Sequence, residues 1–198
     1  MQRTEKYFEK DAFRKSTAGV ILAAEADTKT GGGRIALDGT VFYPEGGGQP
    51  ADRGTLTLAD GTVLHVTDVH ETGGVIWHTV DALPEAAQPG TAVTGAIDWA
   101  WRFDKMQQHT GEHMLSGLAH SMFGCTNVGF HMANDIVTVD FDKPLSAEQI
   151  AELELKVNEA IQRDEPTRTV TVTPEEYETI EIRKKAKGLK GEITVVYA

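Results

Sequence analysis

Two histidines four residues apart, His109 and His113, are the side chains in this sequence whose spacing best suits chemistry. They lie in MQQHTGEH (106–113), inside a segment with the hydrophobic spacing of a helix. On a helix, positions i and i+4 share one face, so both imidazoles can reach one metal ion. Zinc binds neutral imidazole but needs further ligands. The spacing alone leaves two interpretations open: half of a metal site, or a pair of polar, half-buried histidines.

The same stretch contains H-x-x-E-H, the pattern of inverted zinc metallopeptidases. In that interpretation Glu112 is the general base and a glutamate further along the chain is the third ligand. Several glutamates follow, so the sequence allows a peptidase as an alternative. The pattern is short, however, and chance produces it often.

Three other residues near the histidine pair could bind metal. His120 lies seven residues beyond His113, or ~10 Å along a helix axis, which is too far to share one ion. Cys125 and His131 frame the stretch CTNVGFH, which has no known ligand spacing. A single cysteine is more often a small buried apolar side chain than a ligand. We therefore interpret His120 as structural or surface, and expect no ligand role for Cys125 or His131.

A glycine-rich stretch, YPEGGGQPADRG (43–54), precedes the histidines. Consecutive glycines cost backbone entropy but permit close approach by another backbone or a ligand. No Gly-Lys-Ser/Thr and no helical pattern follow, so the stretch is neither a phosphate-binding loop nor a dinucleotide fingerprint. By itself it indicates a tight connection between strands.

Composition limits the class of protein. The 198 residues carry a net charge of −11, which argues against a general nucleic-acid binder. With one cysteine, no internal disulfide is possible. The sequence has no apolar run of ~18 residues for a membrane span and no apolar core in an N-terminal signal. We expect a cytoplasmic protein that does not enter the membrane.

The elements that must position these residues fall into two halves. Residues 1–97 contain short runs of β-formers between 16 and 97, separated by glycine, aspartate and proline. Asp-Gly pairs at 38–39 and 60–61 predict hairpins, and the strand spacing predicts a small barrel.

Residues 98–198 predict an α+β core with an antiparallel sheet. A helix over 98–123 begins at the capping residue Asp98 and ends at Gly124. Ser146 and Gln149 predict a capping box at the start of a second helix, and Pro174 predicts the start of a third. The fold class is therefore α+β, with a glycine-rich β-barrel followed by a two-layer core.

Three stretches, taken in order, resemble one known family. They are LDGTVFYPEGGGQPADRG (37–54), DWAWRFDKMQQHTGEHMLSGL (98–118) and KGLKGEITVV (187–196). The chain resembles the alanyl-tRNA editing proteins, free-standing relatives of the editing domain of alanyl-tRNA synthetase, and looks most like the medium-length AlaX type. The resemblance covers nearly the whole chain.

This resemblance implies a hydrolase that removes serine or glycine from mischarged tRNA for alanine. In the family, zinc is held by the two histidines of H-x-x-x-H and by a Cys-x-x-x-His pair. His109 and His113 are thus the implied first two ligands, and we expect the other two beyond Ala198. Without that pair the chain is expected to bind zinc weakly, and a non-catalytic tRNA-binding remnant is a further alternative.

The resemblance also implies contacts with the substrate. The glycine-rich loop is expected near the editing pocket or at the interface between barrel and core, and a basic segment is expected to meet phosphates at the acceptor end. On the strand after the histidine helix, Gly129 and Phe130 stand near positions where family members carry Gln or Thr. The implied contact residues are Gly46, Gly47, Gly48, Gln49, Arg183, Lys184, Lys185, Lys187 and Lys190.

Overall fold

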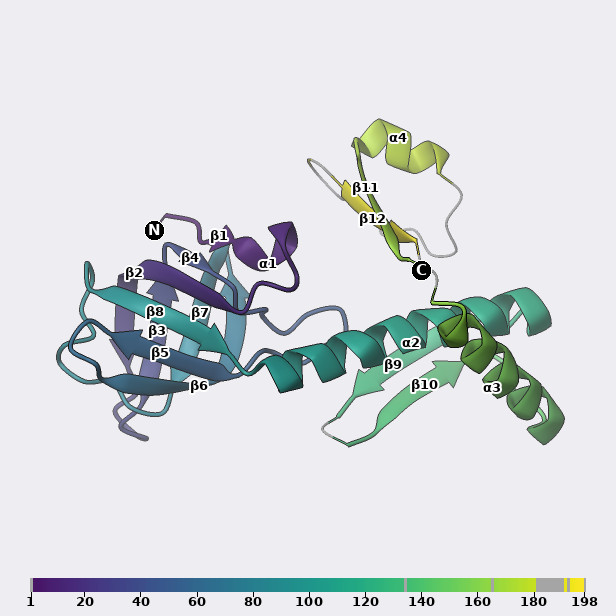
Figure 1. Ribbon diagram of the computed structural model, residues 1–198, viewed down its shortest axis with the longest axis horizontal. Helices are drawn as coiled ribbons and strands as arrows, with labels where there is room; N and C mark the ends of the chain where they lie inside the picture. The colour runs from purple at the N-terminus through teal and green to yellow at the C-terminus, as the bar shows by residue number, and fades with distance from the viewer. Residues whose placement is uncertain (1, 134, 165, 181–190, 192, 198) are drawn as a thin grey trace. The chain divides into compact units, whose positions relative to one another are not determined.

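The computed structural model confirms the α+β fold class (Figure 1). It contains a closed six-stranded barrel, several helices and smaller sheets. The chain forms two compact units, Met1–Gln107 with His131–Val137, and Gln108–Phe130 with Thr138–Ala198. The structure describes residues 2–133, 135–164, 166–180, 191 and 193–197. Within this described part, none of the helices is long and apolar enough to cross a membrane.

The first unit is built around the barrel, whose strands follow one another in the order β2-β3-β7-β6-β5-β8. All six neighbouring pairs are antiparallel. Alternate residues point inward, as the strictly alternating burial of β8 shows, so the interior is filled by apolar side chains such as Ile35, Leu56 and Ile76. The barrel strands are β2 (Ser16–Ala26), β3 (Gly33–Leu37), β5 (Gly54–Leu58), β6 (Val63–Thr72), β7 (Val75–Val80) and β8 (Ala92–Ile97).

Only one of the two predicted Asp-Gly hairpins is present. Gly61 has a φ of 88° in the turn between β5 and β6, where Leu58 N–H donates to Thr62 O, so this prediction is confirmed. The prediction at 38–39 is wrong. There the Asp38 carboxylate accepts from the Val20 and Gly39 N–H groups, and the chain runs on into β4 (Gly39–Thr40). β4 then pairs in parallel with β1 (Glu5–Lys6), which is followed by the short helix α1 (Tyr7–Lys10).

The long helix α2 (Trp99–Phe123) has the predicted ends. Asp98 Oδ1 accepts from the Trp101 N–H, and Gly124 leaves the helix with a φ of 65°. The last barrel strand ends at Ile97, next to the predicted boundary, but the first compact unit continues along α2 to Gln107. That residues 1–97 form a domain by themselves stays a prediction.

Within the second unit, the later part of α2 packs with a strand and a second helix. β9 (Asn127–Met132) pairs with β10 (Val137–Phe141), and α3 (Ala147–Gln162) follows. The predicted capping box of Ser146 and Gln149 is formed. The apolar cluster of this region centres on Ala119, Cys125 and Leu153, with Leu115 and Phe141 among the side chains packed against it.

The last described elements are β11 (Arg168–Val172), the helix α4 (Pro174–Thr179) and β12 (Ile193–Tyr197). β11 and β12 are antiparallel. Pro174 is at the start of α4 as predicted, and Thr173 caps it. Val172, Tyr177, Ile193 and Val195 form a small apolar cluster of their own.

Candidate functional site

His109 and His113 lie together on α2, as their spacing predicts. Their ring centroids are 4.8 Å apart and their planes differ by 26°. His109 is half-buried, and burial together with the neighbouring His113 lowers its pKa. A lowered pKa keeps the imidazole neutral near pH 7, which is the form that binds a metal ion. The two rings therefore offer a pair of nitrogen ligands from one helix face.

Glu112 lies beside this pair and is enclosed by hydrogen bonds. Its side chain is 4% exposed, and its Oε2 is 3.2 Å from His113 Nδ1. Its Oε1 accepts from the Ser116 hydroxyl and from the Asn127 amide. The Asn127 amide also donates to Ser116 Oγ at 3.0 Å. The carboxylate thus accepts two hydrogen bonds on Oε1 and places Oε2 beside His113, inside a small polar cluster formed by α2 and β9.

Phe130 provides an apolar wall next to the histidines. Its ring centroid is 5.6 Å from that of His109. The preceding Gly129 is confined, because a Cβ at this position would lie 2.6 Å from Asp140 Oδ2 on β10. The strand after the helix therefore places an aromatic side chain beside the first histidine.

The other candidate ligands near the pair have ordinary structural environments. Cys125 is buried in the apolar cluster with Ala119 and Leu153, as expected for a small apolar side chain. His120 Nδ1 lies 3.2 Å from Cys125 O at the end of α2. His131 is exposed. That none of the three binds a metal stays a prediction.

Among the described residues, one set of three side chains could bring ligand atoms close together, and it lies in the first unit. Glu45, Asp68 and His70 have ligand atoms within 4.8 Å of one another. All three are exposed or partly exposed, and the His70 Nε2 is 2.7 Å from Asp68 Oδ2. No other set among the described residues brings a third ligand atom to His109 and His113.

The glycine-rich loop contains a tight turn with two central residues, Gly47 and Gly48. Gly46 and Gln49 exchange both backbone hydrogen bonds, at 3.1 and 3.0 Å. Gly47 and Gly48 between them have φ values of 60° and 82°, the positive pair that a type I′ turn requires and that glycine adopts without strain. The Tyr43 hydroxyl donates to Gly46 O. This geometry accounts for two of the three glycines, and contact of Gly46–Gly48 or the buried Gln49 with a substrate stays a prediction.

The end of the same loop is fastened to the first turn of α2. Asp52 is 1% exposed and accepts from the guanidinium of Arg102, which is 3% exposed. Asp52 also accepts from the Tyr43 N–H at 2.8 Å, and Arg102 donates further to Val41 O and Ala12 O. The buried ion pair thus ties the loop to the helix that carries the histidines. Of the predicted tRNA contacts, Arg183, Lys184, Lys185, Lys187 and Lys190 lie outside the described residues.

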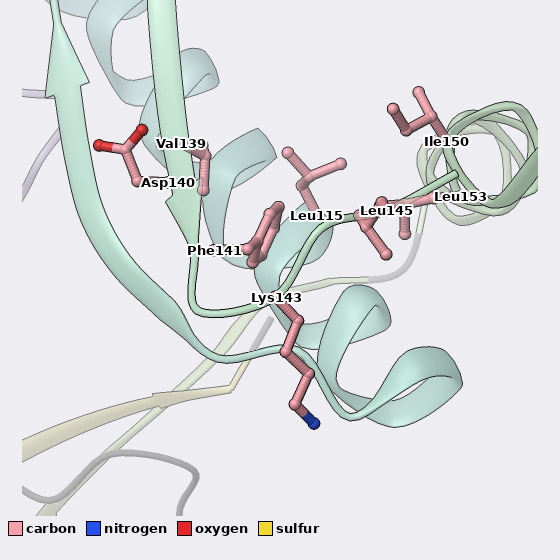
Figure 2. A pocket seen from close by; sticks show the side chains of 8 residues that line it. All are labelled: Leu115, Val139, Asp140, Phe141, Lys143, Leu145, Ile150 and Leu153. Atoms are coloured by element: carbon pink, nitrogen blue, oxygen red, sulfur yellow. The ribbon is translucent and has the colours of Figure 1, made fainter. Parts of the chain in front are cut away.

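A separate hollow of about 380 Å³ lies in the second unit, among α2, β10 and α3 (Figure 2). Leu115, Phe141, Leu145 and Leu153 line it with apolar surface, whereas Asp140 and Lys143 point away from that apolar group. None of the predicted site residues lines this hollow. It has no paired polar groups for catalysis, so the candidate site remains the histidine pair.

Comparison with known proteins identifies the family. The family model of the class II (A) tRNA synthetases matches residues 4–101. The alanyl-tRNA editing protein AlaX-L of Pyrococcus horikoshii is 34% identical over 168 residues, covering 82% of this chain and 40% of that protein. The chain belongs to the alanyl-tRNA synthetase and alanyl-tRNA editing protein family.

Two further members of this family show how the match extends. The alanyl-tRNA editing protein Aarsd1 of Mus musculus is 31% identical over 202 residues, or 95% of this chain, so the match includes the histidine helix. The alanine–tRNA ligase of Pyrococcus furiosus is 36% identical over 169 residues, or 83% of this chain. The chain spans less than half the length of these relatives: 40%, 47% and 18% of them.

The sequence did not predict the polar cluster that Glu112 forms with Ser116 and Asn127. Glu112 and Ser116 are four residues apart on a predicted helix, and that spacing is a usable signal. Asn127 had no comparable signal, because β9 brings it to the helix only through the tertiary fold. The Asp52–Arg102 ion pair was missed for the same reason, since 50 residues separate its members.

Proposed function

We propose that this chain is an aminoacyl-tRNA hydrolase that removes serine or glycine from mischarged tRNA for alanine. Membership of the alanyl-tRNA editing family supports a role in tRNA editing. The observation that carries the proposal is the histidine pair on α2, with rings 4.8 Å apart and an apolar side chain beside them. A reaction on tRNA also agrees with the predicted cytoplasmic location.

The donors at this site fit zinc. His109 is held as neutral imidazole by its lowered pKa, and His113 has a carboxylate next to its second ring nitrogen, as zinc-binding histidines commonly do. When bound, the ion would lower the pKa of a water molecule or bind the amino group of the substrate. His109 and His113 would hold it, and no third ligand atom joins them among the described residues.

The residues of the chain would act mainly by positioning. Hydrolysis of an aminoacyl ester needs a placed water and an oriented ester group. Phe130 beside His109 supplies an apolar wall that restricts the side chain of the amino acid and keeps bulk water from one side of the rings. The basic segment 183–190 is proposed to contact phosphates at the acceptor end, because the net charge of −11 leaves little other attraction for tRNA.

The environment of Glu112 argues against the metallopeptidase alternative. A general base must reach the water that it activates. Here both oxygens of Glu112 already contact His113, Ser116 and Asn127, and the side chain is 4% exposed. The carboxylate is arranged to accept hydrogen bonds within the protein.

The proposal is tested by deacylation of tRNA for alanine charged with serine or glycine, with the correctly charged tRNA as a substrate control. Because the parent chain supplies two of the implied ligands, we expect slow release of serine or glycine that rises with zinc concentration, and loss of this release in His109→Ala. His120→Ala is the matched control, because it removes a histidine from the same helix outside the pair, and it should keep the activity.

Three results would separate the alternatives. Binding of tRNA without deacylation, at any zinc concentration, identifies the chain as a non-catalytic tRNA-binding remnant and refutes the hydrolase. Cleavage of peptides that is lost in Glu112→Gln supports the peptidase. Equal deacylation by the parent chain and His109→Ala removes the histidine pair from the mechanism.

A further inference from the structure

Glu112 is a buried charged group to which the proposed reaction gives no role. Charged side chains are rarely buried unless they are paired, because loss of hydration is costly. Among the described residues, Glu112 makes no contact with a lysine or arginine side chain; its neighbours are Ser116, Asn127 and the imidazole of His113. Ser116 is fully buried as well. The fold therefore buries a carboxylate, at a cost in hydration, next to the Nδ1 atom of His113.

The donors around the carboxylate fix the direction of the hydrogen bonds to its Oε1. A carboxylate can only accept. The Asn127 amide and the Ser116 hydroxyl donate to Oε1. The other oxygen, Oε2, lies 3.2 Å from His113 Nδ1, and a negative oxygen at that distance favours a proton on Nδ1 over a lone pair there. A neutral imidazole with a proton on Nδ1 has its lone pair on Nε2.

We propose that Glu112, held by Ser116 and Asn127, is a positioning residue that keeps His113 in the Nδ1–H tautomer and so presents Nε2 as the metal-binding nitrogen. The identity of the metal rests on the proposed function. The tautomer of His113 does not, because it is a property of the metal-free chain and can be measured there.

The substitution Glu112→Gln gives a sharp test because it keeps the size of the side chain. Asn127 still donates, so the amide oxygen of Gln at position 112 must face Asn127 and Ser116. Its amide NH₂ group then faces His113 Nδ1 and can only donate. We therefore expect the proton of His113 to move to Nε2, which is the opposite tautomer.

A second variant should reverse this change. In Glu112→Gln with Asn127→Asp, the carboxylate at 127 accepts from the amide NH₂ group at 112. The amide oxygen is thereby turned back toward His113, and the Nδ1–H tautomer should return. A residue that merely filled space would produce neither the change nor its reversal.

The measurement is the ¹⁵N NMR spectrum of the histidine side chains in the metal-free chain, at a pH where the imidazoles are neutral. The signals of His120, whose Nδ1 contacts Cys125 O, provide an internal control that should not change. We expect His113 as Nδ1–H in the parent chain, as Nε2–H in Glu112→Gln, and as Nδ1–H again in the double variant. A parent chain with His113 as Nε2–H or as an even mixture overturns the proposal, and so does an unchanged tautomer in Glu112→Gln.

Zinc titration then links the tautomer to the site. Residues that orient metal-binding histidines typically affect metal affinity by about 10- to 100-fold, so Glu112→Gln should weaken zinc binding by that factor. Equal zinc affinity in the parent chain and Glu112→Gln refutes a positioning role. A parent chain that binds no zinc at all refutes the proposed zinc site, and the NMR result then decides the positioning of His113 by itself.

Discussion

The buried ion pair between Asp52 and Arg102 gives the sharpest stability prediction for the first unit. Arg102→Met removes the charge but keeps a long side chain. It leaves the carboxylate of Asp52, which is 1% exposed, with the hydrogen bond from the Tyr43 N–H. It also leaves Val41 O and Ala12 O without their guanidinium donors.

The expected cost follows from these contacts. Breaking a buried pair by removing one partner typically costs about 3–5 kcal/mol, because the other charge stays buried and unpaired. We expect a loss of that size for Arg102→Met and a comparable loss for Asp52→Asn. The double variant has no buried charge left, so its loss should be smaller than the sum by at least about 1 kcal/mol.

Urea denaturation followed by tryptophan fluorescence measures this unit selectively. All three tryptophans, Trp77, Trp99 and Trp101, belong to the first unit. The matched control is Lys10→Met, which breaks the exposed pair between Lys10 and Glu5 and should leave the midpoint unchanged. A change of less than about 1 kcal/mol in the free energy of unfolding of Arg102→Met would refute the reasoning about the buried charge.

Three further predictions concern individual residues. Burial lowers the pKa of His78 from 6.5 to about 4, so only the unfolded chain gains this proton between those pH values, and stability falls as the pH is lowered. The free energy of unfolding of the parent chain should fall by about 3 kcal/mol from pH 6.5 to 4. His78→Gln lacks this titrating group, so urea denaturation should show the difference in unfolding free energy between the two proteins decreasing by that amount. Gly54→Ala places a Cβ 2.1 Å from Ala96 O and should destabilise the barrel by about 1–3 kcal/mol in urea. Gly61→Ala, which strains a φ of 88° but meets no atom within 4 Å, is the control for backbone strain without a clash. Ser146→Ala removes the cap of α3 at a cost of about 1 kcal/mol, which hydrogen exchange should detect as weaker protection of the Gln149 amide.

Local signals in the sequence predicted local structure well. Asp98, Gly124, Ser146 and Pro174 mark the ends of helices because each acts on backbone groups within a few residues. The Asp-Gly pair at 60–61 formed its turn for the same reason. The pair at 38–39 did not, since Asp38 accepts from the N–H of Val20, 18 residues away, and no local pattern contains that contact.

The candidate site shows the same division. The spacing of His109 and His113 placed two imidazoles together, because a helix brings positions four apart onto one face. The sequence order of the glycine-rich loop and the histidine helix indicated the family, which the relatives confirm. The metal and the substrate stay predictions.

The sequence by itself determined the helix ends, the paired histidines and the glycines of the tight turn. Each of these features depends on contacts between residues that are only a few positions apart. The tertiary structure alone decided which distant groups meet. It brought Asp52 to Arg102 across 50 residues, and it brought Asn127 on β9 to the carboxylate of Glu112. The physical reason is that burial makes an unpaired polar group costly, so the partners of a buried group are chosen by the packing of whole elements and leave little trace in local sequence.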